Sequence, residues 1–157
     1  MKISVDIINR QRKIKVSSRR LISRVRKILG LLYEIRDKNF LKIINKNQAL
    51  SVSVILVGDK KIKELNFKYR NKRSITDILS FSYLENEPSG SMFLGELIIN
   101  PKKVLNQAKS YNEKFSKELD RILVHGILHL IGYDHENVSI SKTKKMRKLE
   151  EKILSNL

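Results

Sequence analysis

The chain has 157 residues, 41% of them hydrophobic and 31% charged, which predicts one globular domain with its own core and excludes a disordered chain. It has no cysteine, no apolar run of transmembrane length and no export signal at its start, which excludes thiolate metal ligands and favours the cytoplasm. The formal net charge of +17, from 33 basic and 16 acidic residues, favours a polyanionic partner, and nucleic acid is the usual one.

The first predicted elements are a strand and a basic helix. Residues 3–9 alternate as a strand, and residues 12–16 do so more briefly. Ser17 or Ser18 can then cap a helix, and a helical pattern continues to about residue 46. The apolar stripe of this helix is predicted to lie in the core. It consists of Leu21, Ile22, Val25, Ile28, Leu29 and Leu32.

The opposite face of this helix is rich in arginine. No acidic residue lies within residues 8–33, whereas nine basic residues do, and seven of the chain's eleven arginines fall within residues 10–36. Because a guanidinium can bind phosphate with two hydrogen bonds, the pattern predicts an RNA-binding surface that includes Arg19, Arg20 and Arg24. The alternatives are a merely solvated helix face and, less favoured because the region lacks Trp and Phe anchors, a membrane-surface helix.

The rest of the chain alternates further strands with helices. Residues 49–57 are predicted to form a buried strand, followed by a helix over residues 59–69. Strands follow near residues 76–83 and 94–100, with a loop over residues 85–91.

Three helices complete the chain. Asn100 and Pro101 mark the start of one, a second begins at Ser116, and a third spans about residues 140–156. Four strands and five helices that do not strictly alternate predict an α+β fold rather than a doubly wound sheet.

The chain's three histidines all fall within eleven residues, at His125, His129 and His135. His125 and His129 are four residues apart, so on a helix their rings leave the same face. Gly132 can end that helix in a left-handed conformation, which lets the chain fold back and bring His135 toward the same point. Three imidazoles and one open position commonly hold catalytic zinc, so the spacing predicts one Zn²⁺ per chain. The alternative is a set of histidines that serve only the core.

The skeleton H-x3-H-x2-G-x2-H is similar to that of zinc peptidases with the pattern H-E-x-x-H-x-x-G-x-x-H, and it predicts a metal-bearing helix like theirs. Their general base is the Glu after the first His, where this chain has Gly126, so peptide hydrolysis is disfavoured. Asp134 is a candidate carboxylate near the metal. A role for Asp134 and Gly132 in shaping the turn, or in supporting a ligand from outside its coordination sphere, is at least as well founded.

Three segments carry recognisable motifs. Residues 125–135 read H-G-x-L-H-L-x-G-Y-D-H, residues 65–81 contain L-N-x-x-Y-R followed by T-D-I-L-S-F, and residues 94–99 read L-G-E-L-I-I. Taken in chain order, they resemble the YbeY family of bacterial metal-dependent endoribonucleases, also called rRNA maturation factors, over most of residues 50–136. Ile75 and Ser82 stand where that family often has proline.

The resemblance implies both a fold and an activity. It implies one mixed sheet with helices packed around it, in a single metal-dependent endoribonuclease domain over residues 1–157. The implied reaction is cleavage of single-stranded RNA in maturation of the small-subunit rRNA 3′ end and in ribosome assembly and quality control. The implied partners are rRNA, the small ribosomal subunit with its proteins, and an Era-type GTPase.

The resemblance also implies roles for single residues. His125, His129 and His135 would be both metal ligands and catalytic residues, because zinc makes hydroxide available from water at neutral pH and polarises a phosphoryl oxygen. The family's functional arginine falls on Arg70, which would contact RNA and stabilise charge on the phosphate. An ordinary exposed arginine that binds the carbonyls of its own helix end is the alternative for Arg70.

Two other functions stay open as alternatives. A non-catalytic RNA-binding ribosome-assembly factor would use the histidines as a structural zinc site and the basic helix for docking. A zinc metallopeptidase would need a general base from elsewhere in the chain.

Overall fold

The computed structural model describes residues 2–44, 48–134 and 140–157, and within these ranges it contains four strands and six helices. In chain order they are β1 (Ile3–Asn9), α1 (Ser18–Glu34), α2 (Lys38–Ile43), β2 (Leu50–Leu56), α3 (Asp59–Arg70), β3 (Ile78–Asn86), β4 (Met92–Ile99), α4 (Pro101–Ser110), α5 (Phe115–Leu130) and α6 (Ile140–Leu154). None of the described helices combines the length and the apolar character that a membrane crossing requires.

The four strands form one mixed sheet with the order β1-β2-β4-β3. β1, β2 and β4 are parallel, and β3 returns antiparallel to β4. Among the described strands β1 and β3 are therefore the two edges. The pairing of β3 with β4 is interrupted between Ser82 and Glu85, where Leu84 has a left-handed conformation with φ of 52°. The fold is α+β with a mixed sheet, as expected from the sequence.

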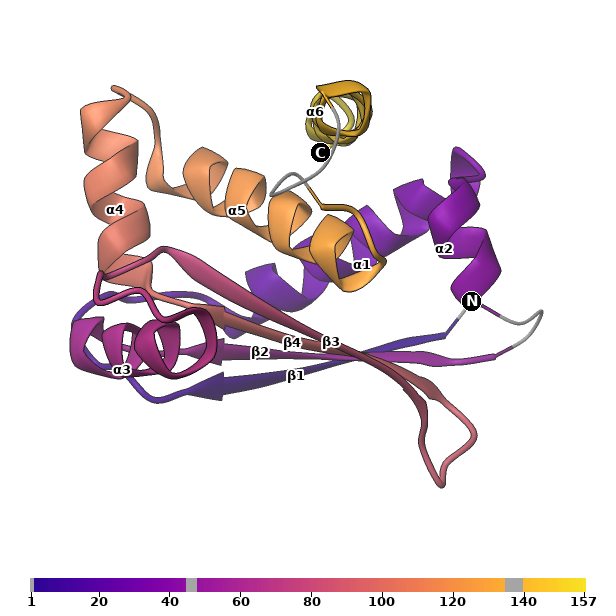
Figure 1. Ribbon diagram of the computed structural model, residues 1–157, viewed down its shortest axis with the longest axis horizontal. Helices are drawn as coiled ribbons and strands as arrows, with labels where there is room; N and C mark the ends of the chain where they lie inside the picture. Colours follow the sequence, from indigo (N-terminus) through magenta and orange to yellow (C-terminus); the bar gives the residue numbers. More distant parts are fainter. Residues whose placement is uncertain (1, 45–47, 135–139) are drawn as a thin grey trace.

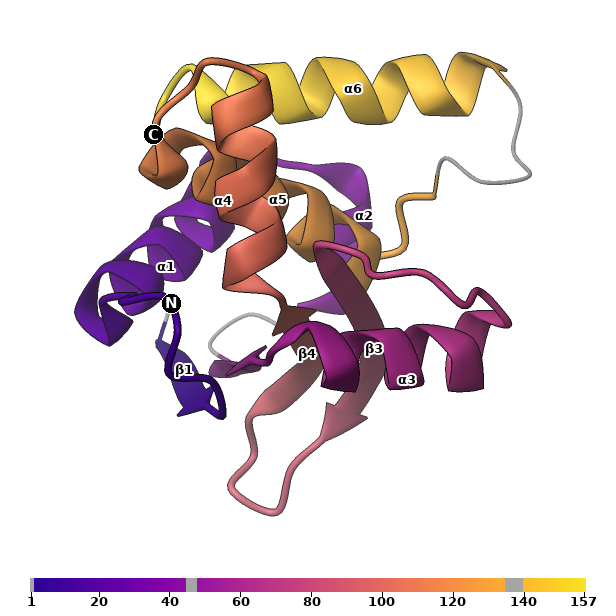
Figure 2. The same cartoon turned by 90° about the vertical axis from the view of Figure 1, so that its left-hand side faces the viewer.

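Figures 1 and 2 show that most helices cover one face of this sheet. α1 packs over β1, α5 packs over β3 and β4, and α4 and α6 pack against α5. The main core lies between these helices and the sheet, and it includes five buried residues of the predicted α1 stripe with Ile22 partly buried beside them. α3 lies on the opposite face, where Ile62 and Leu65 pack with Leu79 and Ile98.

The helical pattern after α1 does not continue as one helix to residue 46, so the expected number of five helices is wrong. Arg36 has a left-handed conformation with φ of 55°, and the next amide, of Asp37, donates to the Leu32 carbonyl. The Asp37 side chain then starts α2 by accepting a hydrogen bond from the Phe40 amide at 2.9 Å. Apolar periodicity cannot show this break, because Phe40 is buried as well and keeps the pattern going.

The alternating residues 12–16 do not form a strand. This segment is a loop, organised by the Gln11 side chain, which bonds the backbone of Lys13 and Ile14. The other strands and helices form where they are predicted, with their ends moved by a few residues. β3 and β4 extend further than expected, to Asn86 and from Met92, which shortens the predicted loop between them.

α5 lies directly on the sheet because Gly126 has no side chain. A Cβ atom at this position would come within 2.5 Å of Cδ1 of Ile78 and 2.9 Å of Cδ2 of Leu97. At the end of the helix, the Ser82 hydroxyl of β3 donates a hydrogen bond to the Leu130 carbonyl at 2.8 Å. These contacts set the position of α5, and hence of its histidines, relative to the edge strand β3.

The close approach at Gly126 predicts that Gly126→Ala destabilises the protein. The added methyl group must displace the terminal methyl groups of the buried Ile78 or Leu97. We expect the cost of this overpacking, about 1–3 kcal/mol, to exceed the roughly 0.5–1 kcal/mol that alanine gains over glycine inside a helix. Gly30→Ala in α1 is the matched control, because nothing lies within 4 Å of a Cβ atom there and alanine favours a helix by about 0.5–1 kcal/mol. Denaturant unfolding should show free energies of unfolding that move in opposite directions. An unchanged value for Gly126→Ala would contradict this packing.

Candidate metal centre and active site

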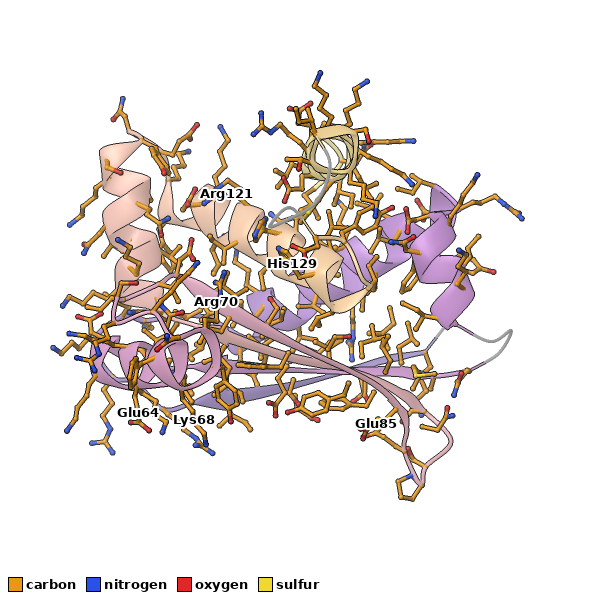
Figure 3. The ribbon with its side chains drawn as sticks, in the orientation of Figure 1. Glu64, Lys68, Arg70, Glu85, Arg121 and His129 are labelled. Carbon is orange, nitrogen blue, oxygen red and sulfur yellow. The ribbon has the colours of Figure 1, made fainter. Side chains whose placement is uncertain are left out.

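A cleft of about 510 Å³ lies along the β3 edge of the sheet. Its walls come from Arg70 at the end of α3, from residues 76–82 in and before β3, and from His125 and His129 of α5. Asp134, which follows α5, also lines it. Figure 3 shows Arg70 and His129 on either side of the space between α3 and α5. The segments that carry the motifs of residues 65–81 and 125–135 therefore meet in one place.

His125 and His129 lie one turn apart on α5, as their spacing predicts. Their Nε2 atoms are 3.2 Å apart. A tetrahedral zinc ion with Zn–N distances of about 2.0–2.1 Å separates two ligand nitrogens by about 3.3 Å. The separation of the two nitrogens is therefore close to that of two neighbouring ligands of such an ion.

Glu150 of α6 contacts His125 at its other ring nitrogen. Oε1 of Glu150 lies 2.7 Å from Nδ1 of His125. An ionised carboxylate at this distance accepts a hydrogen bond from Nδ1–H and leaves the Nε2 lone pair available, which is how metal-binding imidazoles are commonly oriented. The sequence analysis missed Glu150. Glu150 lies four residues after Met146 and three before Ile153, so it shares a helix face with the two buried residues of α6. This spacing is the sequence signal for it, because the rest of the helix is mostly exposed.

The third predicted ligand, His135, lies outside the described residues. In the part of the chain that the structure describes, no three or more His, Asp or Glu side chains are grouped so that they could hold a metal ion. His125 and His129 therefore fit as a partial donor set for a metal, and the three-histidine zinc site stays a prediction.

The chain leaves α5 through a turn that depends on Gly132. Gly132 is left-handed, as predicted, with φ of 87°. Its amide donates to the His129 carbonyl at 3.1 Å, and the Tyr133 amide donates to the Leu128 carbonyl at 3.0 Å, which closes the helix in a Schellman motif.

The buried Tyr133 hydroxyl donates to Asp37 at 2.5 Å, and burial together with this hydrogen bond raises the pKa of Tyr133. The segment that leads toward His135 is thus anchored to the junction of α1 and α2.

The position of the peptidase general base faces the sheet in this fold. Gly126 follows His125 by one residue, which is about 100° around the helix, and it lies against Ile78 and Leu97 rather than in the cleft. A Glu side chain at this position would collide with the sheet. The geometry therefore gives a physical reason against the peptidase alternative.

Arg70 is the last residue of α3, and its side chain lines the cleft. Hydrogen bonds fix the backbone around it: Asn71 is left-handed with φ of 54°, and the Lys72 amide donates to the Asn66 carbonyl. The Asn66 side chain also donates to the Ser74 carbonyl at 2.9 Å, which ties the following loop to the helix. Arg70 thus projects into the cleft from a helix end whose backbone is held in place.

The predicted RNA-binding arginines lie on α1, which packs over the opposite edge of the sheet from the cleft. Arg19 and Arg20 are exposed. Arg24 is only partly exposed, with its Nε 3.1 Å from Oδ1 of Asp120 and its Nη1 donating to the Leu157 carbonyl at 2.7 Å. Burial raises the pKa of Asp120, and the charge of Arg24 opposes that rise. Arg24 links α1 to α5, so the predicted phosphate contact is left to Arg19 and Arg20.

Another cation lies on the same side of α5 as the histidines. Arg121 precedes His125 by four residues, and it binds the buried Glu118 through two hydrogen bonds of 2.9 and 2.6 Å. These hydrogen bonds to Glu118 are the main reason why the pKa of Arg121 is raised. The guanidinium is therefore held in one place and stays charged. Figure 3 shows it further along α5 from His129, above Arg70. The four-residue spacing from His125 is the sequence signal for it.

Comparisons with known proteins agree with these motifs. A family model described as Endoribonuclease YbeY matches residues 6–157. The protein named Endoribonuclease YbeY of Thermodesulfovibrio yellowstonii is 68% identical over 158 residues, which cover 100% of this chain and 99% of that protein. The protein of the same name from Petrotoga mobilis is 33% identical over 155 residues, which cover 99% of this chain and 96% of that protein. The solution structure of TM1509 from Thermotoga maritima has a TM-score of 0.56 at 28% identity, over 97% of this chain and 90% of that one. The chain belongs to the YbeY family.

Proposed function

We propose that this protein is a metal-dependent endoribonuclease that cleaves single-stranded RNA, in maturation of the small-subunit rRNA 3′ end and in ribosome assembly. The observation that carries the proposal is the cleft in which Arg70, His125 and His129 come together. The names of the relatives, each called Endoribonuclease YbeY, support the reaction class. The formal net charge of +17 suits an RNA substrate.

The donor set suits a divalent ion such as zinc. His125, His129 and His135 would hold it, and Glu150 would keep the His125 ring oriented for it. Because the chain has no cysteine, its ligands are limited to imidazole and oxygen donors. When bound, such an ion supplies Lewis-acid chemistry, since it lowers the pKa of water and polarises a phosphoryl oxygen.

Arg70 supplies the second positive contact for the phosphate. A phosphodiester gathers negative charge on its non-bridging oxygens in the transition state, and a guanidinium with two parallel N–H donors can stabilise that charge. Arg70 stands on the wall of the cleft formed by α3, across from the histidines of α5. The volume of about 510 Å³ is that of a small-ligand site, so a few nucleotides of an extended strand fit better than a base-paired helix.

A non-catalytic RNA-binding assembly factor is the second candidate function. The observation that favours it is the position of the exposed Arg19 and Arg20, which lie on α1 over the opposite sheet edge from the cleft. A basic surface there suits docking on the small ribosomal subunit. We propose the subunit's proteins and an Era-type GTPase as partners, in the cytoplasm, on the strength of the family alone.

The metal site predicts that the purified protein contains about one zinc or related divalent ion per chain, and that His129→Ala loses it. Glu150→Ala should weaken metal affinity by roughly 10- to 100-fold, because the His125 ring loses the carboxylate that orients it. Glu151→Ala, an exposed neighbour on α6, is the matched control and should leave the affinity unchanged. Elemental analysis and chelator competition measure these effects. Protein that stays free of metal after zinc addition would refute the site.

The nuclease proposal predicts that Arg70→Ala reduces cleavage of single-stranded RNA by about 100-fold or more while binding changes little, because the lost contact acts mainly in the transition state. Arg70→Lys should restore only part of the rate, since ammonium keeps the charge without the two-pronged geometry. Arg73→Ala is the control for loss of one nearby charge, because this exposed side chain lies 4.7 Å from the Phe67 ring.

Cleavage assays with metal-loaded protein and defined RNAs decide between the two candidate functions. A scaffold would show no metal-dependent cleavage and equal, modest effects of the Arg70 and Arg73 substitutions. Cleavage that survives both Arg70→Ala and His129→Ala would indicate a contaminating ribonuclease and leave the assembly factor as the better supported function.

The basic helix predicts a separable effect on RNA affinity. Replacing Arg19 and Arg20 together with Gln should flatten the dependence of log affinity on log salt by roughly 0.7 per lost contact, because fewer counterions are released. Arg24→Gln should leave that slope unchanged and instead lower the free energy of unfolding by about 1–3 kcal/mol, since Asp120 loses its partner. Salt titrations and urea unfolding measure the two effects. A flattened slope for Arg24→Gln with unchanged stability would contradict this division.

A further inference from the structure

The face of the sheet opposite α1 and α5 is only partly covered. α3 packs at one end of this face, through Ile62 and Leu65. Figure 1 shows that no other described helix lies on this side, so the part of the sheet toward the β3–β4 turn is open.

Four aromatic side chains lie on this open face. Phe81 and Tyr83 are two residues apart on β3 and therefore share one face. Phe93 lies on β4, and Tyr69 reaches this face from α3. The rings of Tyr83 and Phe93 are stacked with centroids 5.5 Å apart, and those of Tyr69 and Phe81 meet edge to face at 4.9 Å. Tyr69 and Tyr83 are 55% and 46% exposed. We call these four residues the aromatic platform. An exposed cluster of this kind marks a binding surface more often than a chance arrangement.

The aromatic platform is continuous with the histidine cleft. A groove of about 220 Å³ is lined by three members of the platform, Tyr69, Phe81 and Tyr83, and Phe93 stacks on Tyr83 beside it. Tyr69 and Phe81 also line the cleft. Both surfaces therefore meet at the free edge of β3, next to Arg70. A chain whose phosphate lies in the cleft can continue onto the platform without crossing another element of the described structure.

The charges around the groove suit a nucleic acid strand with its bases toward the rings. Arg10 and Lys61 line the groove, and Nζ of Lys68 lies 5.1 Å from the Tyr69 ring centroid. Glu96 lies beside Tyr83, and its negative charge is the main reason why the pKa of the Tyr83 phenol is raised. Phosphates are therefore attracted to the basic residues and repelled from Glu96, beside which an uncharged base face fits.

We propose that the aromatic platform binds unpaired RNA bases by stacking, and that it holds the part of the substrate strand that leaves the cleft. Stacking of bases on aromatic side chains is general for single-stranded RNA and tolerates any sequence, because every base has a flat π face. The inference rests on the proposed function, since it assigns a path to the same substrate. It also accounts for the single-strand preference, because paired bases are not available to stack on protein rings.

A fluorescence experiment tests the contact directly. The chain has no tryptophan, so Tyr83→Trp introduces a single indole on the platform. In the His129→Ala background, which prevents cleavage, an unstructured RNA oligonucleotide should quench this indole. Inorganic polyphosphate should bind without quenching, because it carries the charge but no bases. Tyr111→Trp is the matched control, since Tyr111 is 59% exposed at the end of α4, away from the sheet, and should show no quenching.

Affinity measurements give a second readout. Tyr83→Ala and Phe93→Ala should each weaken single-stranded RNA binding about 5-fold or more, the smallest effect expected for one lost stacking contact. Tyr83→Phe keeps the ring and should bind as the unaltered protein does, and so should Tyr111→Ala. If an alanine variant fails to fold, the quenching of the Tyr83→Trp protein decides.

The outcomes separate this inference from the proposed function. RNA that is bound and cleaved without quenching, with normal affinity for the alanine variants, overturns the platform and leaves the nuclease intact. Quenching of the Tyr83→Trp indole by RNA supports the platform, and it removes the nuclease only if protein with His129 intact shows no metal-dependent cleavage. Equal quenching by polyphosphate overturns the stacking contact, because bases are then not required.

Discussion

The close approach of α5 to the sheet is the constraint on which the site depends. α5 is surrounded by β3 and β4, by α1, and by α4 and α6, so most of its circumference is buried. Gly126 of the helix and Gly95 of β4 both let the helix come this near to the strands, since a Cβ atom at Gly95 would meet Cδ2 of Leu130 at 3.0 Å. The side of α5 that remains carries Arg121, His125 and His129 at intervals of four residues. Burial on the other sides therefore selects which residues of α5 can face a ligand.

The same tight packing explains which parts were predictable from the sequence. Features with a local cause follow from the sequence, such as the buried stripe of α1, the spacing of His125 and His129, and the left-handed Gly132. The break at Arg36 does not follow, because the capping residue Asp37 interrupts a helix whose apolar pattern continues. A periodic pattern reports which side of a segment is buried and not whether the segment is one helix or two.

Contacts between distant segments are the other part that the sequence does not reveal. Glu150 meets His125, Asp37 meets Tyr133, and Asp120 meets Arg24 only because the fold brings these elements together. Each of these carboxylates is unremarkable in its own segment. Arg24 is an example from the arginine-rich stretch: its pattern predicts an RNA contact, whereas its side chain joins α1 to α5.

The interruption of β3 has a consequence for solubility. Among the strands that the structure describes, β3 is an edge, and a long, flat edge invites pairing with the same strand of another molecule, which leads to aggregation. The left-handed Leu84 and the break between Ser82 and Glu85 bend this edge before it becomes long. The regular part that remains lies beside the cleft, between the ends of α3 and α5. The bulge thus allows an edge strand to stay open to a flexible ligand while it remains a poor template for a second copy of the chain.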